Sequence, residues 1–250
     1  LGAGGTAGTV SVIGGSTTLA TAPMLAGGSA TSTIVGAVVI GSGLTSQGIL
    51  APGLTDSSVS NQQLTITSSA GIVVASASQV QMSISTPTLT SGNATVFSWL
   101  NSGDTLENYL TANPSDAALL NVAPATYGDH DYLLLTAGGL TLGSRASGAF
   151  GDSSLWVQSH GWASPAAGDL FNLIDWVTSL SGTFSVPGDY TSGGSFGDFD
   201  LPTLSGGLVW DVSAFGSHGI IAVSGIIPEP SRALLIMIGL FVLGVRRRRA

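Results

Sequence analysis

The feature that most constrains the fold is a series of short β-type runs separated by clusters of glycine and small polar residues. Between positions 1 and 90 the runs cover residues 10–13, 34–40, 64–67, 72–75 and 80–84. The clusters between them lie at 14–15, 27–28, 41–43, 57–61 and 68–71. Short strands with small-residue turns and no intervening helices predict a parallel β-solenoid, with a β-sandwich as the alternative.

Composition favours the same class of fold. The chain holds 36 glycines in 250 residues, and only 8% of its residues are charged. Glycine, serine, threonine and valine are weak helix formers, so long helices are not expected. We therefore interpret residues 1–92 as a Gly/Ser/Thr-rich, solenoid-like region of a mainly β body.

A second β region, residues 126–226, is expected to complete this body. Its predicted strands are the apolar runs at 132–136, 140–142, 155–158, 170–177, 183–186, 208–210 and 220–223. Four of the five tryptophans lie in it, at Trp156, Trp162, Trp176 and Trp210. Trp176 and Trp210 stand in strongly apolar runs and are predicted in the core, whereas Trp162 is the candidate for an exposed, sugar-stacking ring.

Residues 93–125 have a different pattern and predict a short helical segment. Leu106, Tyr109 and Leu110 recur at helical spacing, and Asp104 is placed to cap the helix. Pro114 ends that run, and a second short helix can begin at Ser115. We expect one or two short helices that cover an end or a side of the β structure.

Charge and cysteine content exclude several functions. All 14 acidic residues precede position 230, where Arg145 is the only basic residue apart from histidine. Such an acidic body is not expected to bind nucleic acid, which needs a basic face. Because the chain has no cysteine, disulfides, thiolate metal sites and cysteine nucleophiles are excluded.

The C-terminal residues 227–250 contain three features in a fixed order. Pro228, Glu229 and Pro230 come first, and Arg246, Arg247, Arg248 and Arg249 come last. Between them lies an apolar run: Ala233, Leu234, Leu235, Ile236, Met237, Ile238, Gly239, Leu240, Phe241, Val242, Leu243, Gly244 and Val245. The run is apolar on every side and ends in arginines, which predicts one C-terminal transmembrane helix with a cytoplasmic tail. As a helix it would be about 20 Å long, so a buried core helix is the alternative.

This order of features resembles the PEP-CTERM sorting signal of Gram-negative bacteria. The resemblance implies recognition of residues 228–230 by an exosortase and a surface or exopolysaccharide-associated destination. Residues 48–74, with Pro52-Gly53 as a turn before the strand at 64–67, resemble the autotransporter-associated β-strand repeats. Segments 168–176 and 200–223 resemble the region before the tail in PEP-CTERM proteins that carry such repeats.

Several side chains could carry chemistry, and each also has a structural interpretation. His130 lies between Asp129 and Asp131 and could ligate a metal or act as a base, but a solvated turn is favoured. His160 and His218 each adjoin a glycine and are also interpreted as turn residues. Two further candidates are Asp189 with Asp198 or Asp200, for calcium or glycoside chemistry, and Ser195 in a glycine-rich loop.

Together these patterns predict an exported structural or interaction protein of the cell surface or extracellular matrix. We expect no catalytic residues, no metal and no cofactor. The expected partners are the membrane, an exosortase and, in one alternative, extracellular polysaccharide. The protein is expected as a membrane-anchored precursor that is later displayed on, or released from, a Gram-negative cell. A polysaccharide- or calcium-binding module is the alternative function, and a surface hydrolase is disfavoured.

Overall fold

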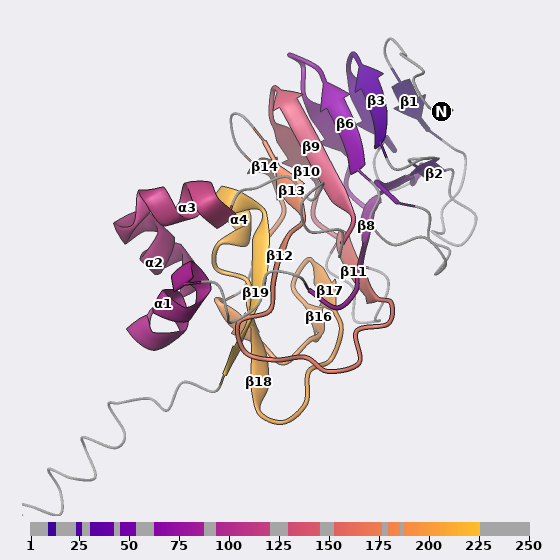
Figure 1. Ribbon diagram of the computed structural model, residues 1–250. Helices are drawn as coiled ribbons and strands as arrows, with labels where there is room; N and C mark the ends of the chain where they lie inside the picture. The colour runs from indigo at the N-terminus through magenta and orange to yellow at the C-terminus, as the bar shows by residue number, and fades with distance from the viewer. Residues whose placement is uncertain are drawn as a thin grey trace, which may run out of the picture.

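Short strands in three parallel sheets and one antiparallel sheet dominate the structure, a computed structural model (Figure 1). It describes residues 10–13, 24–26, 31–42, 46–53, 63–87, 94–120, 130–145, 153–176, 180–185 and 188–225. The three parallel sheets are called A, B and C below, and the antiparallel sheet is called D.

Each parallel sheet is built from strands that recur along the chain. Sheet A contains β1 (Val10–Val12), β4 (Val38–Ile40), β7 (Ile72–Val74), β10 (Leu140–Leu142) and β14 (Leu180–Gly182). Sheet B contains β2 (Met24–Ala26), β5 (Ile49–Ala51), β8 (Gln79–Ile84), β11 (Leu155–Ser159), β17 (Phe199–Leu201) and the antiparallel edge strand β16 (Gly194–Phe196). Sheet C contains β3 (Thr31–Val35), β6 (Gln63–Thr67), β9 (Tyr132–Ala137) and β13 (Ile174–Asp175).

The order in which the chain visits these sheets defines a three-sided parallel β-solenoid. The first turn runs β1, β2, β3, the second β4, β5, β6, and the third β7, β8, β9. Strands of successive turns pair in parallel register, as β4 does with β7 and β6 with β9. A β-sandwich would need antiparallel sheets, so that alternative does not describe this part of the molecule.

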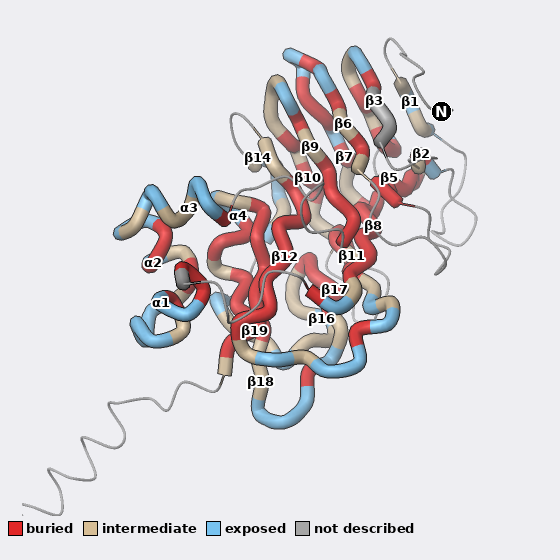
Figure 2. The backbone as a smooth tube through the Cα atoms, in the orientation of Figure 1, coloured by how far each residue is buried: buried red, intermediate tan, exposed pale blue. Residues whose placement is uncertain are grey.

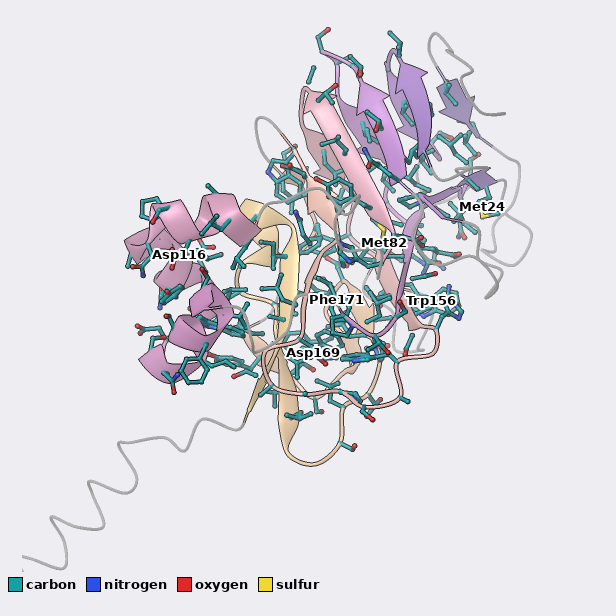
Figure 3. All side chains as sticks on the ribbon, in the orientation of Figure 1. Met24, Met82, Asp116, Trp156, Asp169 and Phe171 are labelled. Atoms are coloured by element: carbon teal, nitrogen blue, oxygen red, sulfur yellow. The ribbon has the colours of Figure 1, made fainter. Side chains whose placement is uncertain are left out.

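Apolar side chains of the three sheets fill the solenoid interior. Along β6, Leu64 and Ile66 are buried while their neighbours Thr65 and Thr67 face outward, as the two-residue period of a strand requires. Met82 lies in this core, whereas Met24 projects at the first turn (Figure 3). Burying this continuous core removes its apolar surface from water, at about 25 cal/mol per Å².

The sequence has no strict period, because the turns of the solenoid have unequal lengths. Val10, Val38, Ile72, Leu140 and Leu180 stand in one ladder of sheet A, although their spacing in the sequence is uneven. The longest interval contains the helical segment. The predicted single strand at 34–40 is two strands, β3 and β4, because the chain turns a corner at Gly36 with φ 126°.

Sheet D separates the solenoid from the helices and is buried on both faces. It consists of β12 (Leu170–Asn172), β19 (Ile220–Gly225), β18 (Leu208–Asp211) and β15 (Tyr190–Thr191). On one face, Phe171, Trp210 and Ile221 join the solenoid core. On the other, Leu170 and Ile220 pack with residues of the helices. In Figure 2, β12 and β19 are coloured almost entirely as buried, between the helices and the solenoid.

Three short helices cover the outer face of sheet D, where one or two were expected. They are α1 (Ala94–Ser102), α2 (Leu106–Ala112) and α3 (Pro114–Leu120), and a fourth, α4 (Phe215–His218), lies before β19. Leu106, Tyr109 and Leu110 form the buried side of α2. The cap of α2 is Thr105, whose side chain accepts the Asn108 N–H, rather than the predicted Asp104.

The fold-class prediction is wrong in its last element, the transmembrane helix. In the part of the chain that the structure describes, no helix has the length and apolar character needed to cross a membrane. The longest, α1, has 9 residues and measures about 13 Å, against a hydrocarbon core of about 30 Å. The run from Ala233 to Val245, where that helix was predicted, lies outside the described residues.

Candidate functional site

The outer side of sheet C presents a row of hydroxyl and amide side chains, which we call the hydroxyl face. Gln63, Thr65, Thr67 and Thr136 form it, on the neighbouring strands β6 and β9. Gln63 Nε2 donates to Thr65 Oγ1 at 2.9 Å, and the hydroxyls of Thr67 and Thr136 are 2.8 Å apart. Parallel strands lie about 4.8 Å apart, so these side chains lie close together on one side of the sheet. Two apolar side chains share that side: Leu134, paired with Thr65, and the exposed Val35, paired with Thr67.

Tyr132 and Asp175 extend sheet C beyond the hydroxyl face. The Tyr132 hydroxyl donates to Asp175 Oδ2 at 3.2 Å, although Tyr132 itself is buried. Burial, together with the Asp175 carboxylate, raises the pKa of Tyr132 well above its ordinary value. Tyr132 therefore stays protonated and acts as a hydrogen-bond donor in this sheet.

Asp189 was predicted to pair with Asp198 or Asp200, but both of these possible partners are buried, where they hydrogen-bond to loops. Asp198 Oδ1 accepts from the Ser144 hydroxyl at 2.9 Å and from the Arg145 N–H at 2.8 Å, while its Oδ2 accepts from the Ser185 N–H at 2.6 Å. One carboxylate thus joins two loops that are far apart in the sequence. Such bonds to an ionised acceptor are among the strong hydrogen bonds of a protein.

Asp200 likewise accepts hydrogen bonds from two segments that are separate in the sequence. Its Oδ2 accepts from the Ser153 N–H at 2.8 Å, and its Oδ1 accepts from the Ser195 hydroxyl at 2.6 Å. The Ser195 hydroxyl therefore donates its hydrogen bond to a carboxylate rather than to an imidazole, which is not the arrangement of the Ser-His-Asp triad. Asp189, the third acid of the predicted set, is exposed.

Asp211, which the sequence did not single out, connects sheet D to the helices. Its Oδ2 accepts from the Leu106 N–H at 2.8 Å, and its Oδ1 accepts from the Ser213 N–H at 3.0 Å. Burial raises the pKa of Asp211, against the lowering effect of these hydrogen bonds. Burial and the nearby Asp211 also raise the pKa of Tyr190, to about 12.

The three histidines lie at separate places in the fold. His130 is buried, its Nε2 is 2.7 Å from the carbonyl oxygen of Asn172, and its ring meets Phe171 edge-on at 6.0 Å. Asp131 is also buried and accepts the Ser83 N–H, so the favoured solvated turn is wrong for both residues. The position of Asp129 lies outside the described residues. Both residues lie just before β9 and contact the end of β8, through a bridge between His130 and Ile84 and a backbone hydrogen bond from Asp131 to Ser83.

The other two histidines flank short loops. His160 is partly buried after β11, and His218 Nε2 lies 3.8 Å from Glu107 Oε2 at the surface. Among the described residues, no group of three or more histidine, aspartate or glutamate side chains is arranged to hold a metal ion.

Trp162, predicted as an exposed sugar platform, is buried. Its ring lies 5.3 Å from both Phe171 and Trp210, and its Nε1 donates to Asp169 Oδ2 at 3.1 Å. Figure 3 places Asp169 and Phe171 together where the solenoid meets sheet D. Trp210 is in the core as predicted, whereas Trp176 is only partly buried and packs against the core, with its ring 6.4 Å from that of Phe215.

Sequence reasoning missed the role of the buried acids and of Trp99, which is buried beneath the helices. An Asp-x-Ser pattern at residues 211–213 was the available signal, since such residues commonly form local side-chain–backbone turns. The sorting-signal residues, Pro228 to Pro230 and Arg246 to Arg249, lie outside the described residues. Comparisons with protein-family models, curated proteins and solved structures found no match for this chain.

Proposed function

We propose that the protein is an exported structural or interaction protein of the cell surface or extracellular matrix of a Gram-negative bacterium. The main support for this proposal is the location of the polar side chains of the solenoid, some buried between loops and others on its outer side. Asp198 and Asp200 are buried and hydrogen-bond to separate loops, and the outer side of sheet C carries the hydroxyls of Thr67 and Thr136. A rigid body of this kind is suited to spacing or presenting other components, as repeat architectures commonly do.

We propose no catalysed reaction for the β body. Among the candidate catalytic residues, Asp198 and Asp200 accept hydrogen bonds from backbone N–H groups and from the hydroxyls of Ser144 and Ser195. A catalytic carboxylate needs an approach for substrate and a role in proton transfer, whereas these groups accept N–H and O–H bonds inside the fold.

The sorting part of the proposal rests on the sequence. Residues 228–230 and the terminal arginines would direct the exported chain to an exosortase, which would process it near Pro228. Extracellular polysaccharide remains the partner of the alternative function, and the hydroxyl face is the surface that would meet it. With Trp162 buried, that contact would be made by hydroxyls rather than by an exposed tryptophan ring.

Fractionation of a Gram-negative host that encodes an exosortase tests this function. The chain, preceded by a bacterial leader, is compared with a double variant, Pro228→Ala/Pro230→Ala. We expect wild type at the surface with a shortened C-terminus, and the double variant retained with its tail intact. Pro165→Ala, in a loop of the body, is the matched control and should behave as wild type. Equal surface display and identical C-termini for all three would refute the sorting proposal.

A further inference from the structure

We draw no further inference here: the strongest candidate, the hydroxyl face of Gln63, Thr65, Thr67 and Thr136 on the outer side of sheet C, carries nothing because these side chains hydrogen-bond to one another and nothing in the structure shows what covers them.

Discussion

Gly71 and Gly138 turn the chain at a corner where two successive turns of the solenoid touch backbone to backbone. Both have positive φ, 72° and 70°. A Cβ on Gly71 would lie 2.3 Å from the carbonyl oxygen of Gly139, and one on Gly138 would lie 2.5 Å from that of Ser68. Glycine is needed here for two reasons, the left-handed backbone and the close approach of the next turn.

The two reasons can be separated by substitution. Gly161 has φ 74°, but an added Cβ there would meet nothing within 4 Å. We expect Gly161→Ala to cost about 1 kcal/mol of unfolding free energy, the cost of the backbone conformation alone. Gly71→Ala should cost at least about 3 kcal/mol, because the neighbouring turn must also move. Urea unfolding followed by circular dichroism measures both values. Equal losses would mean that the turns do not stack as described.

Asp198 gives a second prediction at the scale of the residue. Replacing it by asparagine puts an amide donor where its carboxylate now accepts N–H and hydroxyl protons, so at least one bond becomes a clash between donors. We expect Asp198→Asn to lower the unfolding free energy by about 2–3 kcal/mol. Asp189→Asn, the same change at an exposed position, should leave it unchanged within error. Denaturant titration of the two variants checks this, and similar losses would contradict the structural role.

At the scale of the element, the helices depend on local capping and on one buried side. The α2 helix has seven residues, too few to be stable in isolation, and it is held by Leu106, Tyr109 and Leu110 against sheet D. Two N–H groups of its first turn have acceptors: Asn108 donates to the Thr105 side chain, and Leu106 donates to Asp211 on β18. The helix is therefore stabilised both by a local cap and by a contact with sheet D.

The cap can be identified by comparing neighbouring residues. We expect Thr105→Ala to cost about 1 kcal/mol, since the Asn108 N–H loses its acceptor. Asp104→Ala, at the predicted cap, should have no measurable effect. Thermal unfolding of the two variants distinguishes them. A larger loss of stability for Asp104→Ala than for Thr105→Ala would show that Asp104 caps the helix.

The molecule as a whole is joined across its layers by Asp211, and this makes its stability depend on pH. Burial raises the pKa of Asp211 above its ordinary value of 3.8, so the folded state holds this proton more tightly than the unfolded state. The resulting stabilisation is present below the unfolded pKa and is lost as pH rises through the folded pKa. Asp189 lies near enough to favour the protonated form further.

Unfolding of wild type and Asp211→Asn across pH isolates this contribution. We expect the wild-type stability relative to the variant to fall as the pH rises above 3.8, the ordinary pKa of this group, and through its higher folded pKa, because only wild type loses the proton. A relative stability that instead rises with pH would show that the hydrogen bonds from Leu106 and Ser213 outweigh burial. Measuring both proteins at each pH cancels the titration of the other acids.

The sequence by itself determined the β character, the turns rich in glycine and the helical segment. These follow from local propensity and from the positions of apolar residues, as at Leu64 with Ile66 or Leu106 with Leu110. The strands at 24–26 and 49–51 were missed because they are three residues long and have no clear alternation. The unequal turns also hid the period that would have revealed the solenoid.

Only the tertiary structure decided which polar residues face water. His130, Asp131, Trp162, Asp198 and Asp200 look like surface or site residues in the sequence, yet all are buried. A short polar segment is solvated or enclosed according to what packs over it, and that neighbour is distant in the sequence. The backbone N–H of Ser83 donates to Asp131, and those of Arg145 and Ser185 donate to Asp198. The free energy of burying a carboxylate is offset by such partners, so its place follows from the whole fold and not from the residues beside it.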